Sequence, residues 1–286
     1  MTRKTLFSNP AGITGIILLA VGVFVFVVSP LLAAIISLVY ILLCVIACFF
    51  PQTNFLLTVI SHGQTGKNFV ALTFDDGPAE PTTRQVLDLL DKYSVKATFF
   101  VSVVNAQRFP EIIKDMLSRG HSIGNHSLSH NPFLMLTSFK NLYREISEAQ
   151  QILRNMGIRT LVFRPPVGIV NPKLSPILNK LGMFCVTFSC RAFDAGNLHV
   201  RNIASKILQK VKSDDIILLH DVPPRRKEDS EALMPEIERL ITGIIAKGLR
   251  IIPLAELINK EVMSNSQNHR GEEINTKLLS KPSCAR

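Results

Sequence analysis

The sequence lacks tryptophan entirely and has only three tyrosines, whereas phenylalanine occurs 17 times in 286 residues. Tryptophan and tyrosine combine a large apolar ring with a polar tip, which makes them frequent anchors of ligand-binding surfaces. A recognition surface built on indole rings is therefore excluded. Any aromatic platform has to be made mainly from phenylalanine.

Cysteine is sparse and unpatterned. The five cysteines are odd in number and no two are separated by two residues: Cys44, Cys48, Cys185, Cys190 and Cys284. This spacing excludes a CxxC metal pair and argues against a disulfide framework. Such cysteines are consistent with a reducing compartment, although buried cysteines act as small apolar residues wherever they occur.

Charge is absent from one long segment. Residues 11–50 contain no Asp, Glu, Lys, Arg or His. A helix needs roughly 20 apolar residues to cross a bilayer, so this run is long enough to cross twice. Ser29 and Pro30 lie near its midpoint, where proline breaks a helix. We predict a transmembrane helical hairpin at 11–50, preceded by a short basic tail at 1–10. A cleaved signal peptide is the alternative, but its apolar region is usually only about 7–15 residues long.

The charges before this hairpin predict its orientation. Two spans return the chain to the side on which it starts. Arg3 and Lys4 precede the first span, and the positive-inside rule assigns such residues to the cytoplasm. We therefore expect a two-span protein of the cell membrane whose main domain lies on the cytoplasmic face. A single span would place that domain on the opposite side, so the number of spans decides the orientation.

The overall charge is strongly positive. The formal net charge is +10, from 32 Lys and Arg against 22 Asp and Glu. For a chain with membrane spans the nearest anions are lipid headgroups and phosphates, so we expect membrane lipid as one partner. The sequence has no helix-turn-helix, zinc-finger or aromatic-basic pattern, and we expect no binding to nucleic acid. Nothing in the sequence requires an obligate protein partner.

The remainder of the chain alternates between strand and helix patterns. A short polar linker at 51–66 is followed by this alternation as far as about residue 261, which is typical of an α/β fold with a largely parallel sheet. Expected strands are 70–74, 98–102, 161–163, 183–189, 216–219 and 250–253, and expected helices are centred on 86–90, 112–117, 139–156, 203–211 and 233–245. Residues 262–286 are polar and are expected to form a flexible tail.

Two polar motifs predict a metal centre. Residues 73–78 (TFDDGP) place the adjacent carboxylates of Asp75 and Asp76 between a strand and a Gly-Pro turn. His126 and His130 are four residues apart, so both rings can face one point on a helical or tightly turned segment. Two histidines and one carboxylate, with a position open for water, are typical of a catalytic zinc site. Taken singly, the acidic pair is also compatible with a solvated turn, and the histidine pair with a surface loop.

Three further polar segments each follow or end an expected strand. They are residues 163–168 (FRPPVG), 188–194 (FSCRAFD) and 216–221 (IILLHD). In a βα barrel the carboxyl ends of the strands converge on one mouth, so side chains from these segments are expected to meet. Taken alone, His220 is also compatible with a buried core histidine.

Together the TFDDGP, HSLSH, RPPVG and LLHD strings, in this order, resemble those of the polysaccharide deacetylase family, also called the NodB-homology family. The resemblance covers about residues 67–261. It implies an α/β fold, a distorted and incomplete βα barrel of the NodB-homology type, here preceded by the hairpin. It also implies a hydrolase that removes N-acetyl or O-acetyl groups from carbohydrates.

The resemblance implies the central catalytic roles. Asp75 is the general base, His220 is the general acid, and the metal ligands are Asp76, His126 and His130. One divalent ion is expected, zinc by default, although cobalt, manganese and nickel accept the same donors. The ion lowers the pKa of its water toward ~7, so the base has to accept only one proton.

Supporting residues complete the implied site. They are Arg164, which orients the base; Asp194, which keeps the acid charged; Val167, whose backbone N–H stabilises the oxyanion of the tetrahedral intermediate; and Leu218, which lines the acetyl-sized pocket.

Departures from the family pattern lie in residues 188–195. Phe188 replaces the usual tryptophan, Arg191 stands where an acid is common, and Ala195 stands where an aromatic residue is usual. Phe193 and Tyr143 compensate only partly for the missing stacking rings. Arg191 suggests pairing with a substrate phosphate, as in a sugar carried on a polyprenyl phosphate, and an ordinary ion pair is the alternative.

These observations predict a metal-dependent carbohydrate deacetylase, which acts on carbon–nitrogen bonds other than peptide bonds. It removes an acetyl or formyl group from an amino sugar of a membrane-proximal polysaccharide or a lipid-linked glycan. One alternative is a catalytically silent, membrane-anchored barrel that binds or assembles glycans. Another is a barrel hydrolase of glycosidic or phosphodiester bonds, which the segments around Arg164 and His220 disfavour.

Overall fold

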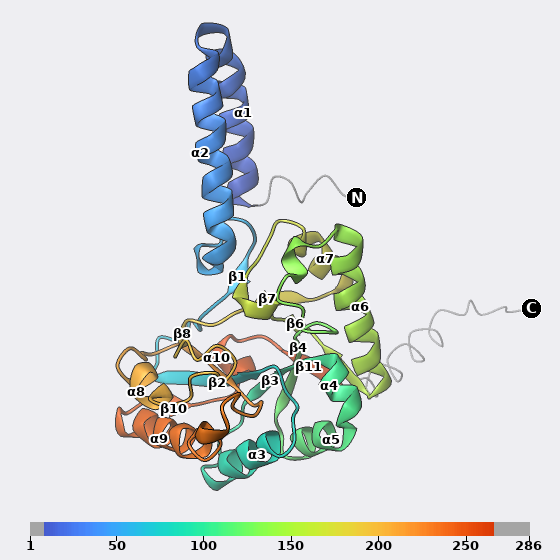
Figure 1. Ribbon diagram of the computed structural model, residues 1–286, viewed down its shortest axis with the longest axis vertical. Coiled ribbons are helices and arrows are strands. Elements are labelled where there is room, and N and C mark those ends of the chain that lie inside the picture. The colour runs from blue at the N-terminus through green and yellow to red at the C-terminus, as the bar shows by residue number, and fades with distance from the viewer. Residues whose placement is uncertain (1–8, 266–286) are drawn as a thin grey trace, which may run out of the picture.

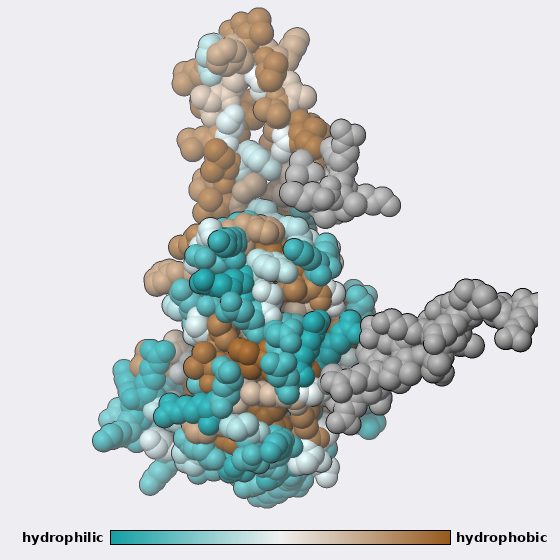
Figure 2. Space-filling view, turned by 90° about the vertical axis from the view of Figure 1, so that its right-hand side faces the viewer, coloured by the Kyte–Doolittle hydropathy of each residue, from teal (hydrophilic) through white to brown (hydrophobic). Residues whose placement is uncertain are grey.

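The structure is a computed structural model that describes residues 9–265. Its first two helices, α1 (Pro10–Val28) and α2 (Pro30–Phe49), stand side by side and project from one end of the remaining domain (Figure 1). The chain reverses at Ser29, whose side-chain oxygen accepts a hydrogen bond from the N–H of Leu32. Both helices are long and apolar enough to cross a membrane. Figure 2 shows the apolar surface of the hairpin above the more polar surface of the domain.

The two hairpin helices pack closely. The Tyr40 hydroxyl donates to the carbonyl of Ala11 at 2.8 Å. A Cβ placed on Gly15 would lie 2.5 Å from the same hydroxyl, so only glycine allows this approach. The base of the hairpin is joined to the domain through the side chain of Asn9, which donates to the carbonyl of Leu56 at 2.6 Å.

The domain is built on a parallel sheet that curls into an incomplete barrel, as predicted. The strands follow the order β1-β7-β6-β4-β3-β2-β9-β8, with β10 paired to β2. Their bounds are β1 (Val59–Ile60), β2 (Phe69–Asp75), β3 (Thr98–Val101), β4 (Ser122–Asn125), β6 (Val162–Phe163), β7 (Phe184–Val186), β8 (Cys190–Arg191), β9 (Ile216–His220) and β10 (Arg250–Ile251). Within residues 9–265 no ladder joins β8 to β1, although a single bridge links His62 to Asp215.

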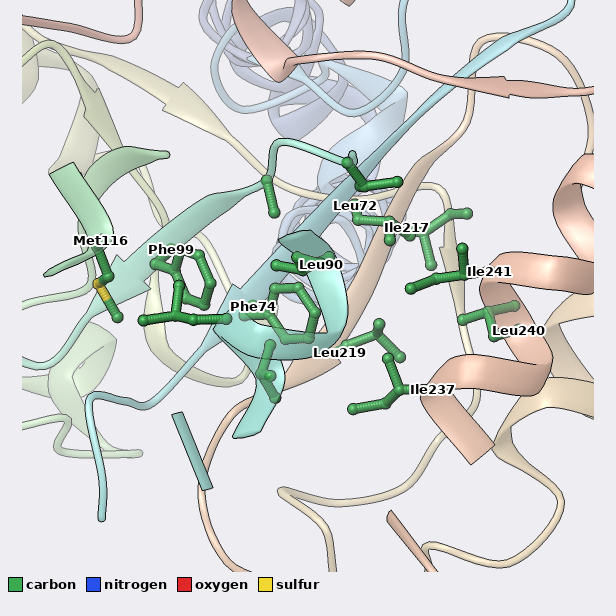
Figure 3. Packing of buried hydrophobic residues seen from close by; sticks show 14 of the residues in the cluster. Leu72, Phe74, Leu90, Phe99, Met116, Ile217, Leu219, Ile237, Leu240 and Ile241 are labelled. Carbon is green, nitrogen blue, oxygen red and sulfur yellow. The ribbon is translucent and has the colours of Figure 1, made fainter. Parts of the chain in front are cut away.

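Helices cover the outside of this sheet (Figure 1). They are α3 (Thr82–Lys92), α4 (Val103–Arg108), α5 (Pro110–Ser118), α6 (Phe139–Asn155), α7 (Leu174–Leu181), α8 (Ile203–Leu208) and α9 (Leu233–Ala246). Outward-facing strand residues pack against them, and Figure 3 shows Phe74 and Leu219 between Leu90 and Ile237. The short helix α10 (Leu254–Leu257) packs with the inward-facing residues of the strands.

The strand register brings the polar strand ends together. Asp75, the last residue of β2, is level with His220 at the end of β9 and with Phe100 in β3. Side chains alternate along a strand, so Thr73 and Asp75 share the inner face while Phe74 faces the helices. The register therefore explains why segments far apart in the sequence can form one site.

Several segments differ from the sequence-based expectations. The predicted linker at 51–66 contains the 3₁₀ helix η1 (Pro51–Thr53) and strand β1, because the chain pairs with β7 as soon as it leaves the hairpin. Strands β4 and β8 and helices α4, α7 and α10 were not predicted. The polar tail expected at 262–286 begins with strand β11 (Met263–Asn265), which pairs antiparallel with β5 (Ile158–Thr160). The rest of that tail lies outside the described residues.

Candidate active site

Asp75 and Asp76 point to different partners because the chain turns sharply between them. Strand β2 ends at Asp75, and Asp76 adopts a positive φ of 77°. Gly77 follows, and its N–H donates to the buried Asp221 carboxylate at 3.1 Å. A Cβ at Gly77 would collide with that carboxylate. The glycine of the TFDDGP motif is therefore required by this close approach, and the turn separates the two acids.

Arg164 lies beneath the site and fixes Asp75. Its guanidinium is fully buried and donates to the Asp75 carboxylate at 2.7 Å and to the Thr73 hydroxyl at 2.8 Å. It also donates to the carbonyls of Val186 and Thr187. Burial lowers the pKa of Arg164, and the charge of Asp75 opposes that effect. The planar fork therefore holds one oxygen of the carboxylate in place.

Asp76, His126 and His130 form a compact donor cluster. Their ligand atoms all lie within 4.8 Å of one another, and the Asp76 carboxylate lies 2.9 Å from His130 Nε2 and 3.4 Å from His126 Nε2. Burial alone would raise the pKa of Asp76, but hydrogen bonds from both histidines lower it well below its usual range. The carboxylate is thus ready to bind a cation.

The orientation of His126 supports a metal site. Its Nδ1 lies 2.8 Å from the carbonyl oxygen of Arg164. A carbonyl only accepts, so Nδ1 carries a proton, and Nε2 is the ring nitrogen that faces Asp76. The segment between the histidines is a tight turn rather than a helix, with positive φ at Ser127 and His130. The residues present therefore fit a divalent ion bound by two imidazoles and one carboxylate.

His220 and Asp194 form a second polar pair. His220 Nδ1 lies 2.6 Å from the Asp194 carboxylate. Burial lowers the pKa of His220, but the hydrogen bond and charge of Asp194 outweigh it and raise that pKa to about 9. The imidazole is therefore protonated at neutral pH, with Nδ1 engaged and Nε2 available.

One cleft of about 550 Å³ unites these groups. It is lined by ten of the eleven residues singled out from the sequence: Asp75, Asp76, His126, His130, Val167, Arg191, Phe193, Asp194, Leu218 and His220. Arg164 is the exception, because it lies under the cleft floor. The expectation that Tyr143 supplies a stacking ring is wrong. Tyr143 belongs to α6, where its ring packs beside Lys180 and does not line the cleft.

Val167 has an unusual backbone. It adopts φ 55° and ψ 7° in the short 3₁₀ helix η3 (Pro166–Gly168), a conformation that β-branched residues rarely occupy. Its side chain is half exposed at the cleft. Among residues 9–265 its N–H has no hydrogen-bond acceptor. Val167 therefore brings a backbone donor without an acceptor among these residues to the cleft wall.

Arg191 has no carboxylate partner in the part of the chain that the structure describes, so the ordinary ion pair is not found there. Its guanidinium instead lies over the rings of Phe193, at 4.2 Å, and Phe188, at 5.1 Å. Burial lowers its pKa, and the charge of Asp194 opposes this. The side chain lines the cleft with its charge uncompensated by an ion pair.

Several contributing residues were missed from the sequence. Asp221 accepts hydrogen bonds from Gly77 and from the Thr83 hydroxyl, and its complete burial raises its pKa to about 7. Asn197 donates to the carbonyl of His220. Arg225 lines the cleft. Only Asp221 could have been found from the sequence, because it directly follows His220 in the LLHD motif. Asn197 and Arg225 belong to no motif.

The comparisons with known proteins agree with this geometry. The polysaccharide deacetylase family model matches residues 62–186. The chain is 33% identical to a peptidoglycan-N-acetylglucosamine deacetylase of Bacillus cereus, over 67% of this chain and 89% of that protein. It is 32% identical to a chitooligosaccharide deacetylase of Sinorhizobium fredii, over 72% of this chain and 98% of that protein.

Solved structures share the fold. A crystal structure of a peptidoglycan N-acetylglucosamine deacetylase matches with a TM-score of 0.64 and 28% identity, over 71% of this chain and 94% of that one. A pseudoenzyme of the same fold from Bacillus anthracis matches with a TM-score of 0.62, 20% identity, and coverage of 70% and 68%. At that identity the second match concerns the fold alone. The sequence relatives, together with the parallel incomplete barrel, establish that this chain belongs to the polysaccharide deacetylase family.

Proposed function

We propose that this protein is a metal-dependent deacylase that removes an acetyl or formyl group from an amino sugar of a membrane-proximal polysaccharide or lipid-linked glycan. The observation that carries the proposal is one cleft that is lined by the Asp76, His126 and His130 donors together with Asp75 and His220. Residues 67–261 would form the catalytic domain, and the hairpin would hold it at a bilayer.

The cluster fits a divalent ion, with zinc as the default and cobalt, manganese or nickel as substitutes. When bound, the ion would supply Lewis-acid activation of a water molecule and of the acyl oxygen. Asp75 accepts the proton of the attacking water through the oxygen that Arg164 leaves free. The water oxygen then forms a bond to the acyl carbon.

Two groups of the chain stabilise the next step. The free N–H of Val167 donates to the acyl oxygen as negative charge develops there, and a donor of this kind is typically worth about 3 kcal/mol. His220 gives its Nε2 proton to the leaving nitrogen while Asp194 holds Nδ1. The carbon–nitrogen bond breaks, and a carboxylate and a free amine are released.

The substitution Asp75→Asn tests this proposal. It keeps an oxygen that can accept from Arg164 but removes the base, so release of acetate from an acetylated chitooligosaccharide should fall by roughly 10²–10⁴-fold. Metal content, measured on the purified protein, should stay the same because Asp76 and both histidines remain. Asp229→Asn is a matched control, since Asp229 is a buried acid that lies outside the cleft and pairs with Arg201.

The silent-barrel alternative makes the opposite prediction. A protein that uses the barrel only to bind glycans would release neither acetate nor formate from any glycan, with or without added metal. The complete set of proposed base, ligands and acid in one cleft favours the enzyme. Detection of either product, lost in Asp75→Asn and retained in Asp229→Asn, would rule out the silent barrel.

Arg191 supports a phosphate-bearing substrate. Its charge lies in the cleft on two phenylalanine rings without an ion-pair partner among the described residues, and Arg225 lines the same cleft. Guanidinium groups suit phosphate because their donors form a planar fork. Arg191→Ala should therefore reduce turnover of a polyprenyl-phosphate-linked sugar more than that of the same sugar without phosphate. Arg226→Ala is the control, because Arg226 is exposed and does not line the cleft. Equal losses on both substrates would refute the phosphate role.

A further inference from the structure

One loop connects the donor cluster to the base of the hairpin. It runs from His130 through the 3₁₀ helix η2 (Leu134–Leu136) to the start of α6 at Phe139. Pro132 lines the catalytic cleft. We call residues 130–139 the membrane loop.

The buried part of the membrane loop packs against the hairpin. Leu134 and Met135 belong to the same apolar cluster as Ala11 of α1 and Ala47 of α2. The cluster also contains Val170, whose N–H donates to the carbonyl of Cys48 in the last turn of α2 at 3.0 Å. The loop is therefore fixed relative to the ends of the two apolar helices.

Hydrogen bonds hold the loop itself in shape. The side chain of Asn171 donates to the carbonyl of Met135, and the Lys173 ammonium donates to the carbonyl of Thr137 at 2.6 Å. Both donors come from the segment between η3 and α7, which lies at the hairpin end of the domain (Figure 1). This anchoring means that the exposed side chains of the loop keep a defined direction.

The remaining large side chains of the loop are apolar and exposed. Leu136 is 80% exposed, Phe133 67% and Phe139 49%. Three such side chains within seven residues are unusual on a surface that faces water. Phe49 and Phe50, at the end of α2, are exposed as well. In Figure 2 apolar surface likewise extends from the hairpin onto the adjoining part of the domain.

We propose that Phe133, Leu136 and Phe139 dip into the interfacial region of the bilayer that the hairpin crosses, so that the membrane loop seats the catalytic cleft at the lipid surface. The inference rests on the membrane location that forms part of the proposed function. The partner is the lipid bilayer itself, because the loop is anchored through a shared apolar cluster to the ends of two helices of membrane-spanning length. Phenylalanine and leucine are the residues that enter this region on interfacial segments.

A cleft held at the lipid surface would affect which substrates can reach the metal donors. His130 lies four positions before Leu134, and an extended chain advances at most about 3.6 Å per residue, so the Cα of this metal donor lies within roughly 15 Å of the Cα of Leu134 in the apolar cluster at the hairpin base. A sugar attached to a lipid headgroup can reach the donors without leaving the surface. The loop would thus favour substrates that are presented by the membrane.

The absence of tryptophan supplies a direct test. Leu136→Trp introduces a single indole at the most exposed of the three apolar positions. The full chain is reconstituted into phosphatidylcholine–phosphatidylglycerol vesicles, and fluorescence is recorded with and without brominated lipids. We expect a blue-shifted emission that brominated lipid quenches at least twofold. Phe133→Trp is a second reporter, in case Leu136→Trp fails to fold.

Ile245→Trp is the matched control. Ile245 is 52% exposed on α9, at the end of the domain away from the hairpin (Figure 1), and its emission should show neither the shift nor the quenching. Unquenched loop reporters, equal quenching of loop and control reporters, or a chain that does not float with the vesicles would each overturn the proposal. The readout is independent of deacylation, so quenching without activity would contradict the proposed reaction and leave the membrane loop standing.

Discussion

The residue that most directly sets the chemistry of His220 is Asp194. The imidazole is almost fully buried, and burial disfavours its charged form. The 2.6 Å contact with Asp194 reverses that preference, since a buried carboxylate stabilises the imidazolium strongly where water is excluded. Asp194 is therefore the main cause of the raised pKa of His220, and the charges of Asp76 and Asp75 add to its effect. Removing the negative charge of Asp194 should be visible in a pH profile.

Asp194→Asn is predicted to move the alkaline limb of kcat/KM to lower pH. The protonated imidazole is the active form, so activity is lost as pH rises through the pKa of His220, which is raised to about 9 in the intact protein. Without the carboxylate of Asp194, the largest influence that opposes burial is lost, so the pKa of His220 falls and the limb shifts toward neutrality. The measurement is kcat/KM for an acetylated chitooligosaccharide from pH 6 to about 10, a range that brackets the normal and raised values. A limb that stays in place would show that His220 is not the titrating acid.

The sequence predicted which side chains share the cleft, but it did not predict how deeply each side chain is buried. Asp76, His126 and His130 were recognisable because their residue types and spacing suit a metal, and ten of the singled-out side chains share the cleft. The position of Arg164 beneath the floor was not predictable, because its four hydrogen-bond acceptors come from two other strands, β2 and β7, or their ends. Burial of a charge depends on partners that only the fold assembles.

At the scale of elements, the strands most rich in branched residues were the easiest to predict. β2 and β9 are continuous apolar runs, and both were expected within one or two residues of their bounds. β4 was missed because its sequence, Ser-Ile-Gly-Asn, has little intrinsic preference for a strand. Pairing with β3 on one side and β6 on the other holds it extended. Tertiary pairing therefore overrides local propensity at this strand.

Gly124→Ala is predicted to destabilise the domain through β4. A Cβ at this position would lie 2.5 Å from the Phe100 ring and 3.1 Å from Val162. The Phe100 ring also packs 3.9 Å from the guanidinium of Arg164, so it cannot move aside freely. Overpacking of this kind typically costs about 1–3 kcal/mol, which should lower Tm by several degrees.

The control for this strand is Ser122→Ala. Ser122 lies two residues earlier in β4, is only partly buried, and makes no side-chain hydrogen bond among the described residues. Its replacement should leave Tm nearly unchanged. Thermal unfolding followed by circular dichroism compares the two variants. A Tm for Gly124→Ala that equals that of Ser122→Ala would mean that the barrel interior relaxes more easily than the contacts imply.

At the scale of the whole molecule, both ends of the hairpin meet the same domain. Asn9 and Ala11, at the start of α1, bond to the carbonyls of Leu56 and Phe55. Cys48, at the end of α2, accepts from Val170. The start of α1 and the catalytic cleft therefore lie at the same end of the hairpin. If the hairpin crosses the bilayer, the N-terminus and the domain share one side of the membrane.

Reporter fusions should place that side in the cytoplasm, because Arg3 and Lys4 precede the first span. Green fluorescent protein fused to the C-terminus should fluoresce, and alkaline phosphatase at the same position should be inactive, since each folds in only one compartment. Deleting residues 30–49 leaves a single span and should reverse both readouts. Active phosphatase on the full chain, or a chain shortened by cleavage after the hairpin, would contradict the two-span orientation. The contacts of Asn9 and Cys48 with one domain favour the shared side.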